Sequence, residues 1–182
     1  MIPGSTKTAI ADSFIDLLTS RPGRISVSDI AEHCGVSVQT FYNHFRNKDD
    51  LIRWIYRERS HEIASKIGIG GYQWRDALHD WLVYLRTDSL FVTNALSDVI
   101  GSDELIGAME EITTESLTEE VVRSSEGEAL PPDTADLVRI YCYGICRFLY
   151  SWLNDPEPMD MESVHALAIK SLPYPLHRYL LG

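Results

Sequence analysis

The sequence has no hydrophobic run long enough to cross a membrane, because nowhere do 18 uncharged apolar residues follow one another. The first ten residues, MIPGSTKTAI, carry one Lys and no apolar run of signal-peptide length. We therefore expect a cytoplasmic protein with no membrane partner. Cysteine is scarce too: Cys34, Cys142 and Cys146 form no CxxC pair, so we expect buried free thiols and neither a disulfide framework nor a zinc site.

Catalytic constellations are also absent from the sequence. We find no Ser-His-Asp or Cys-His order, no phosphate loop and no paired-carboxylate site. His79 stands beside Asp80, but adjacent helix positions point about 100° apart and cannot converge on a metal without other ligands. We therefore predict no enzyme, no catalytic residue, no cofactor and no metal site.

Positive charge is in short supply overall, since the net charge of −11 has the wrong sign for a simple nucleic-acid binder. The distribution is uneven, however. Residues 1–60 hold 8 Lys+Arg and 7 Asp+Glu, whereas residues 61–182 hold 8 and 20. An acidic body behind a near-neutral head would orient the head toward phosphates and keep the body away from them.

Apolar residues recur at helical spacing along the whole chain, and no alternating strand pattern is present. We predict an all-α fold of about nine helices, with an N-terminal three-helix head and a C-terminal helical body. The cluster of Gly68, Gly70 and Gly71 marks a boundary. The predicted domains are an N-terminal domain at 1–48, a connecting fourth helix at 48–66, and a C-terminal domain at 67–182.

One stretch, SVSDIAEHCGVSVQTFYNHFRNK from Ser26 to Lys48, predicts two short helices joined by a tight turn. Ser26 and Asp29 form a variant of the capping box, and Ser37 caps the second helix. Gly35 takes the positive φ that the turn requires at no steric cost. Helices with so short a link cross at a large angle, which is the helix-turn-helix arrangement.

The helix that Ser37 caps is the predicted recognition helix. Its N-terminus favours phosphate, Gln39 can pair bidentately with adenine, and Lys48 adds a phosphate contact from the next helix. By spacing, Val38, Phe41, Tyr42 and Phe45 line one side of it. The predicted DNA-binding residues are Ser26, Ser37, Val38, Gln39, Thr40, Tyr42, His44 and Lys48.

The run SVSDIAEHCGVSVQTFYNHFRNKDDL, behind one N-terminal helix, resembles the DNA-binding head of TetR-family transcriptional regulators over about residues 7–55. LacI-type repressors share an AxxxGVS fragment, but they carry it at the extreme N-terminus before an α/β body, which does not fit here. The resemblance implies that residues matching Val38, Phe41 and Phe45 hold the head together. FYNHFRNKDDLIRWIY and YCYGICRFLYSW are also similar to the DhaS-like activator subgroup of the family.

The resemblance further implies that residues 1–48 are a helix-turn-helix DNA-binding domain and that residues 67–182 are a ligand-binding, regulatory and dimerisation domain. It implies a homodimer formed through residues 133–154 and 160–171, and a small-molecule effector site in the body. The candidate pocket residues are Trp74, Trp81, Tyr84, Phe91, Met109, Tyr141 and Phe148. The same aromatic stripes fit simple core packing, and both interpretations stay open at this point.

The implied function is a sequence-specific transcriptional regulator that acts as a homodimer on a double-stranded DNA operator under effector control. The alternative is an activator or coactivator module that works mainly through a protein partner. The acidic helix that begins at about Leu105 could be the surface that such a partner binds. We expect its acidic face to be solvated rather than a binding surface. That face consists of Glu110, Glu111, Glu115, Glu119 and Glu120.

Overall fold

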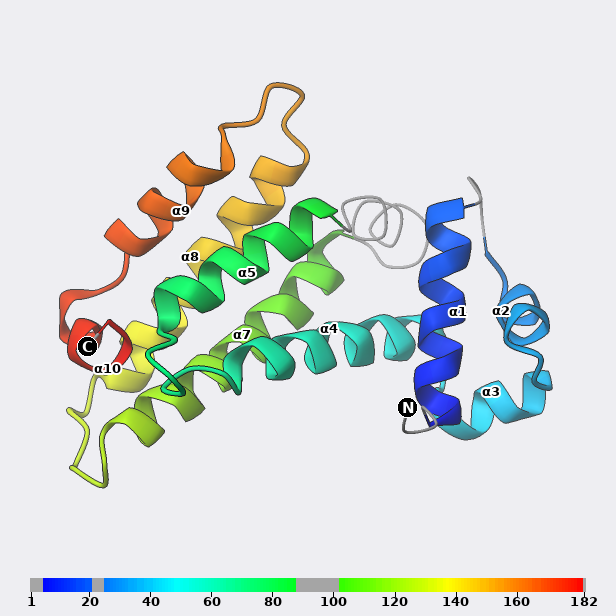
Figure 1. The fold of residues 1–182 in the computed structure, drawn as a ribbon, viewed down its shortest axis with the longest axis horizontal. Coiled ribbons are helices and arrows are strands. Elements are labelled where there is room, and N and C mark those ends of the chain that lie inside the picture. The colour runs from blue at the N-terminus through cyan, green and yellow to red at the C-terminus, as the bar shows by residue number, and fades with distance from the viewer. Residues whose placement is uncertain (1–4, 21–24, 88–101, 182) are drawn as a thin grey trace. The chain divides into compact units, whose positions relative to one another are not determined.

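The computed structural model describes residues 5–20, 25–87 and 102–181. In these ranges the chain forms nine α-helices and one short 3₁₀ helix, η1, and contains no β-strand (Figure 1). This confirms the all-α fold. The predicted helix around Phe91 lies outside the described residues. The elements are α1 (Thr6–Ser20), α2 (Val27–Cys34), α3 (Val38–His44), α4 (Lys48–Ala64), α5 (Trp74–Thr87), α7 (Ser102–Ser124), α8 (Thr134–Leu153), α9 (Met161–Lys170), η1 (Tyr174–Leu176) and α10 (His177–Leu180).

The described residues fall into two compact units, which we call the head and the body. Of the described residues, the head contains 5–20, 25–55 and 102–105, and the body contains 56–87 and 106–181. The chain passes from one unit to the other inside α4, between Ile55 and Tyr56, and again inside α7, between Leu105 and Ile106. Two helices, α4 and α7, therefore contribute to both units. The predicted domain limits at residues 48 and 67 stay a prediction.

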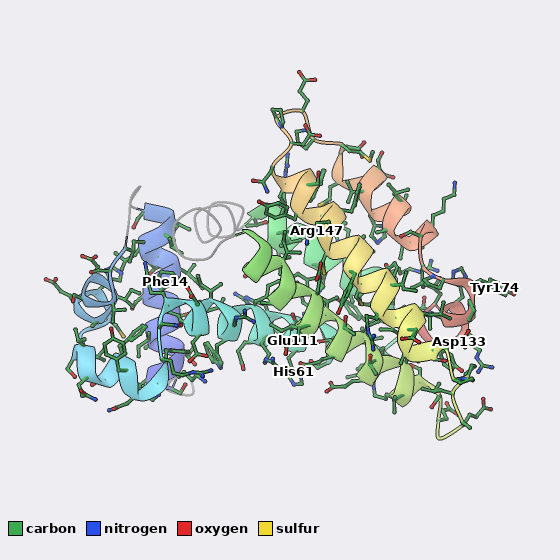
Figure 2. All side chains as sticks on the ribbon, turned by 180° about the vertical axis from the view of Figure 1, so that it is seen from behind. Phe14, His61, Glu111, Asp133, Arg147 and Tyr174 are labelled. Atoms are coloured by element: carbon green, nitrogen blue, oxygen red, sulfur yellow. The ribbon has the colours of Figure 1, made fainter. Side chains whose placement is uncertain are left out.

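The head is built on a core to which each of its helices contributes. α1 buries Ile10, Phe14 and Leu18 on one face, as its i, i+4, i+8 spacing predicts, and Figure 2 shows Phe14 inside the head. α1 packs on α2, and α2 packs on α3. The remaining buried residues of the head are Ala11, Leu17, Ile25, Ile30, Ala31, Phe41, Phe45, Leu51, Ile52 and Ile55.

In the body, a chain of hydrogen bonds joins α5, α8 and α9. The indole Nε1 of Trp74 donates to the Tyr141 hydroxyl at 3.4 Å, and that hydroxyl donates to the carbonyl of Ala168 at 3.1 Å. Burial raises the pKa of Tyr141, so its hydroxyl stays a donor at neutral pH. The polar atoms of these aromatic side chains are thereby satisfied inside the core.

The C-terminal tail closes one end of the body. η1 contacts both α8 and α10, and Leu176, Tyr179 and Leu180 are buried. Tyr174 is the exception, since it is 84% exposed and projects away from the helices (Figure 2). No helix in the described ranges is long and apolar enough to span a membrane.

Two expectations about the body and the thiols need correction. Glu120 does not lie on the solvated face of α7: it is 4% exposed and accepts hydrogen bonds from Arg123 and from the Ser124 hydroxyl, the latter at 2.9 Å. Arg123 also donates to the carbonyl of Ile67, beyond the end of α4. Cys142 and Cys146 are buried free thiols as predicted, but Cys34 is only partly buried.

Candidate nucleic-acid interface

α2 begins at the capping box that the sequence predicts. The Ser26 hydroxyl accepts the backbone N–H of Asp29 at 3.1 Å, and the Asp29 carboxylate accepts the backbone N–H of Ser26 at 2.7 Å. Two backbone donors that would otherwise be unpaired at the helix start are satisfied in this way. The box fixes the path by which the chain enters α2.

The turn between α2 and α3 depends on Gly35. This residue has φ +71°, in the left-handed region, and its backbone N–H bonds to the carbonyls of Ala31 and Glu32 at the end of α2. Val36 then donates to Ala31 at 2.9 Å, which completes the cap. The chain changes direction within three residues, so α3 starts at once and is held close to α2.

α3 is short, and its orientation is set by what it buries. Phe41 is fully buried and Phe45, just beyond the helix, is 2% exposed. The Phe45 ring packs on Trp54 of α4, with centroids 5.7 Å apart. The ammonium of Lys7 lies over the same two rings, 5.2 Å from Phe45 and 4.9 Å from Trp54. α1, α3 and α4 are thus joined through one aromatic cluster.

The face of α3 opposite this core is exposed and polar. Ser37 caps the helix by accepting the backbone N–H of Thr40 at 3.0 Å, and the two hydroxyls lie 2.8 Å apart. Gln39, Tyr42 and His44 are exposed, Tyr42 at 51%. A helix N-terminus flanked by hydroxyl, amide and phenol groups can bind phosphates and reach base edges.

Lys48 is placed differently from a free surface lysine. Its ammonium donates to the carbonyl of Ile25 at 2.5 Å, immediately before the Ser26 cap. The side chain therefore links the start of α4 to the start of α2. It brings positive charge to the Ser26 backbone, where a phosphate contact was predicted.

Val38 corrects part of the prediction. Spacing and family resemblance both placed it among the residues that hold the head together, yet it is 39% exposed. Phe41 and Phe45 already fill the core side of α3, so Val38 lies at the edge of the exposed face. The prediction that Val38 is a core residue is therefore wrong, while its place among the predicted DNA-binding residues stays a prediction.

Two residues outside the predicted set share this surface. The Gln39 amide donates to the side-chain oxygen of Asn43 at 3.2 Å, which holds the two amides side by side. Arg46 follows α3, and its side chain is 89% exposed while its Nε lies 3.8 Å from the Asp50 carboxylate. The i, i+4 spacing of Gln39 and Asn43 was the sequence signal for the first of these.

The predicted pocket residues of the body do not all come together. Trp74, Trp81 and Met109 are buried in the core, and Trp81 packs on Tyr84 and Tyr56 with centroids 5.5 and 4.9 Å apart. Tyr141 and Phe148 instead line a groove of about 360 Å³ between α8 and α9, which we call the α8–α9 groove. Its lining is Ile140, Tyr141, Gly144, Ile145, Phe148, Leu167, Ala168, Ser171 and Pro173.

The interior of the body contains polar groups beside these aromatics. The hydroxyls of Tyr56 and Thr113 lie 3.3 Å apart, and the Cys146 thiol lies 3.7 Å from the same Thr113 oxygen. Burial raises the pKa of Tyr56 and raises that of Cys146 to about 12. In the described residues, no group of three His, Cys, Asp or Glu side chains is arranged to hold a metal ion.

The head has the parts that define a helix-turn-helix protein: a capped first helix, a left-handed glycine turn and a second helix whose polar face is open. Residues 22–55 match the family model described as "Bacterial regulatory proteins, tetR family". The head of this chain therefore matches the DNA-binding domain of TetR-family transcriptional regulators. Members of this family are transcriptional regulators and not enzymes, which confirms the prediction that the protein is not an enzyme.

A curated relative supports the same assignment. The dhaKLM operon transcriptional activator DhaS of Lactococcus lactis subsp. lactis (strain IL1403) is 36% identical over 87 residues, which is 47% of this chain and 46% of the relative. The match thus spans about half the length of that protein. It agrees with the similarity to the DhaS-like subgroup that the sequence indicated.

Solved structures share the fold over nearly the whole chain. The dihydroxyacetone kinase operon activator DhaS has a TM-score of 0.67 at 23% identity, covering 92% of this chain and 94% of that one. The TetR family repressor AlkX from Dietzia sp. strain DQ12-45-1b, implicated in biodegradation of n-alkanes, has a TM-score of 0.58 at 21% identity, covering 94% and 95%. A TetR transcriptional regulator from Streptococcus agalactiae 2603V gives 0.60 at 19%, covering 92% and 93%.

Proposed function

We propose that the protein is a cytoplasmic, homodimeric transcriptional regulator that reads a double-stranded DNA operator with the exposed face of α3. The observation that carries this proposal is the division of α3 into two sides. Phe41 is fixed in the core while Gln39, Tyr42 and His44 stand open behind a capped N-terminus. These exposed side chains do not contribute to the core of the head, and their polar groups suit contacts with base edges in the major groove.

A binding assay with a matched control tests this. Fragmented genomic DNA from the source organism is selected on the protein at stated salt, and affinities for the selected fragments are then measured. Tyr42→Ala should weaken binding about 10-fold or more, the scale of one lost contact worth ~1.4 kcal/mol. Tyr174→Ala removes an exposed tyrosine from the body and should bind like the parent. Equal affinities for the Tyr42 variant and the parent would show that the assigned surface is wrong.

The second element of the proposal is dimerisation through α8 and α9, the segments predicted for this role. An apolar groove between two helices that carry exposed Ile140 and Leu167 supports it. Two recognition helices in a dimer would enter successive major grooves about 34 Å apart. Sedimentation equilibrium measures the mass directly, and a monomer at micromolar concentration would rule the dimer out.

The third element is control by a small molecule in the body. The aromatic and hydroxyl groups around Tyr56, Trp81 and Thr113 support a site for a small ligand with both apolar and hydrogen-bonding parts. α4 carries Tyr56 in the body and also belongs to the head, so a ligand there would bias the DNA-competent state. A metabolite screen by thermal shift, followed by DNA release, checks this; ligands that shift the melting temperature without changing DNA affinity count against it.

A second candidate function is activation through a protein partner. It is favoured by the exposed carboxylates Glu111, Glu115 and Glu119 on α7 and by the activator relative DhaS. Pull-downs that recover a stoichiometric protein, combined with a purified protein that ignores all genomic DNA, would favour this function over direct DNA reading.

A further inference from the structure

Two histidines from distant parts of the sequence meet on the surface of the body. His79 lies on α5 and His165 lies on α9, and their rings contact edge to face, with centroids 6.0 Å apart and planes at 87°. α5 packs on α9, and both helices belong to the body. In the sequence, His79 has only Asp80 beside it as a further candidate ligand. The fold supplies the second imidazole from far along the chain.

One nitrogen of the His165 ring is paired with a backbone carbonyl. Nε2 lies 2.8 Å from the carbonyl oxygen of Arg75, one helical turn before His79 on α5. A carbonyl oxygen only accepts, so Nε2 carries a proton and donates it. In the neutral ring, Nδ1 then has an available lone pair. Within the described ranges, His165 makes no hydrogen bond through Nδ1.

A carboxylate sets the tautomer of the other ring. Nδ1 of His79 lies 3.6 Å from Oδ1 of Asp80, while Oδ2 of the same carboxylate accepts a hydrogen bond from the Tyr72 hydroxyl at 2.7 Å. The 3.6 Å separation is too long for a hydrogen bond, but the negative charge favours the tautomer with its proton on Nδ1. That tautomer leaves the lone pair of His79 on Nε2.

The two rings thus share the arrangement that is usual for histidines that bind metals. In such sites one ring N–H faces a backbone carbonyl or a carboxylate, and the other ring nitrogen binds the ion. His165 has the carbonyl of Arg75 in this role, and His79 has the carboxylate of Asp80. Imidazole nitrogens are preferred ligands of zinc and of neighbouring transition metals.

We propose that His79 and His165 bind one Zn²⁺ ion, through Nε2 of His79 and Nδ1 of His165. Two imidazoles on one tetrahedral Zn²⁺ have ring centroids about 5 Å apart, because each nitrogen lies about 2.0–2.1 Å from the ion. The rings therefore need to close by about 1 Å from their present separation of 6.0 Å. The His79 side chain is 51% exposed, so a small rotation is open to it.

The charge of the body favours a cation on this surface. Residues 61–182 carry 20 Asp and Glu against 8 Lys and Arg, so their electrostatic potential is negative on average and attracts cations. Water completes the coordination of the ion, since the described residues contain no cluster of three His, Cys, Asp or Glu ligands. Two protein ligands make a reversible site, whose occupancy follows the concentration of the free metal. The bound ion joins α9 to α5 and stabilises their packing by mass action.

Calorimetric titration with Zn²⁺ tests the site. All proteins carry Cys34→Ser, which removes the one cysteine that is not buried. This parent should bind one ion per chain. His79→Ala and His165→Ala should each raise the dissociation constant about 10-fold or more, because each removes one of the two protein ligands. His61→Ala is the matched control: it removes an exposed histidine from α4 in the body and should bind like the parent.

Thermal unfolding tests whether the ion joins the two helices. Zn²⁺ should raise the melting temperature of the parent, because the folded state alone holds both ligands together. The same addition should leave the melting temperature of His165→Ala unchanged. Mg²⁺, which prefers oxygen ligands, should not raise the melting temperature of either protein. Equal shifts with Zn²⁺ in the parent and in His165→Ala would show that the ion binds elsewhere.

NMR of the histidine ring nitrogens tests the assigned atoms in the parent, and it needs no substitution that could impair folding. Zn²⁺ should shift the signals of Nδ1 of His165 and Nε2 of His79 most strongly. A parent that binds no Zn²⁺, or a His79 or His165 variant that binds as tightly as the parent, overturns the proposal. Loss of binding in His61→Ala also overturns it, because the ion would then lie on α4.

Discussion

At the scale of single residues, the neighbours Phe41 and Tyr42 have different roles: Phe41 stabilises the core of the head, and Tyr42 belongs to the proposed DNA-binding face. Phe41 is 0% exposed and Tyr42 is 51% exposed, although both are aromatic and both belong to α3. Phe41→Ala should lower the free energy of unfolding by about 3–5 kcal/mol because it empties a buried site. Tyr42→Ala should change it by less than about 0.5 kcal/mol. Urea unfolding followed by circular dichroism distinguishes them, and similar losses for both variants would contradict the assigned sides.

The turn between α2 and α3 requires the left-handed backbone conformation of Gly35. At φ +71° an alanine is strained, so Gly35→Ala should destabilise the head by about 1–2 kcal/mol. Gly107→Ala provides the control with the opposite sign. It lies in α7 with nothing within 4 Å of a built Cβ, and should stabilise by about 0.5–1 kcal/mol. Denaturant midpoints measure both changes, and a stabilising Gly35 variant would mean that the turn does not need glycine.

At the scale of elements, Glu120 and Arg123 fasten α7 to the chain beyond α4. The carboxylate is buried at 4% exposure, and the Arg123 guanidinium bridges it to the Ile67 carbonyl. Glu120→Gln replaces a charged acceptor and should cost about 2 kcal/mol, the scale of a hydrogen bond to a charged group. Glu119→Gln makes the same change on an exposed neighbour and should stay within about 0.5 kcal/mol. Thermal unfolding compares the two, and equal shifts would refute the fastening role.

The sequence allowed the helices and caps to be predicted because they depend on local chemistry. Ser26 with Asp29, the Gly35 turn and the Ser37 cap are signals between residues a few positions apart, and all three appear in the structure. Glu120 and Val38 were misplaced because their environment is set by distant segments. Helical spacing cannot show that Arg123 will bridge Glu120 to Ile67, nor that Phe41 and Phe45 will leave no room for Val38 in the core.

The two candidate sites also differ in whether local sequence or the packing of distant segments determines them. The exposed face of α3 follows from a motif, so its residues could be named in advance. The α8–α9 groove depends on how α8 and α9 pack, and only Tyr141 and Phe148 of the predicted pocket residues line it. Trp74, Trp81 and Met109 are buried away from this groove, and aromatic spacing alone could not separate them from the residues that line it.

At the scale of the whole molecule, the buried thiols predict a dependence of stability on pH. Burial raises the pKa of both Cys142 and Cys146 from 9.0 to about 12. Above pH 9 the unfolded chain releases these protons while the folded chain retains them. The free energy of unfolding should therefore fall between pH 9 and 12, by up to about 1.4 kcal/mol per pH unit for each thiol.

A pair of variants isolates this effect from other alkaline titrations. Urea unfolding at pH 8 and pH 10 should show a smaller loss for Cys142→Ala/Cys146→Ala than for the parent. Cys34→Ser, which changes the partly buried thiol, should keep the parent's loss. Identical losses in all three proteins would show that the buried thiols titrate normally.

The division of charge fits a regulator whose head alone meets DNA. Residues 61–182 carry 20 acidic against 8 basic residues, so the body is repelled by phosphates while the head is nearly neutral. The fold does not set the sign of regulation, because both the activator DhaS and the repressor AlkX share it. We expect the specificity for DNA sequence to come from the few exposed side chains on α3.

The claim that α3 reads the DNA sequence is tested most directly by the sequence preference of the parent and of Gln39→Ala. This preference is determined by selection from random duplexes and sequencing. We expect the parent to select a two-fold symmetric site with half-sites about 10 base pairs apart. The Gln39 variant should keep that spacing and lose preference at one position in each half-site, since a bidentate contact to a base carries about 1–3 kcal/mol of discrimination. An unchanged motif in the variant, or no enriched motif for the parent, would contradict the claim that α3 reads DNA.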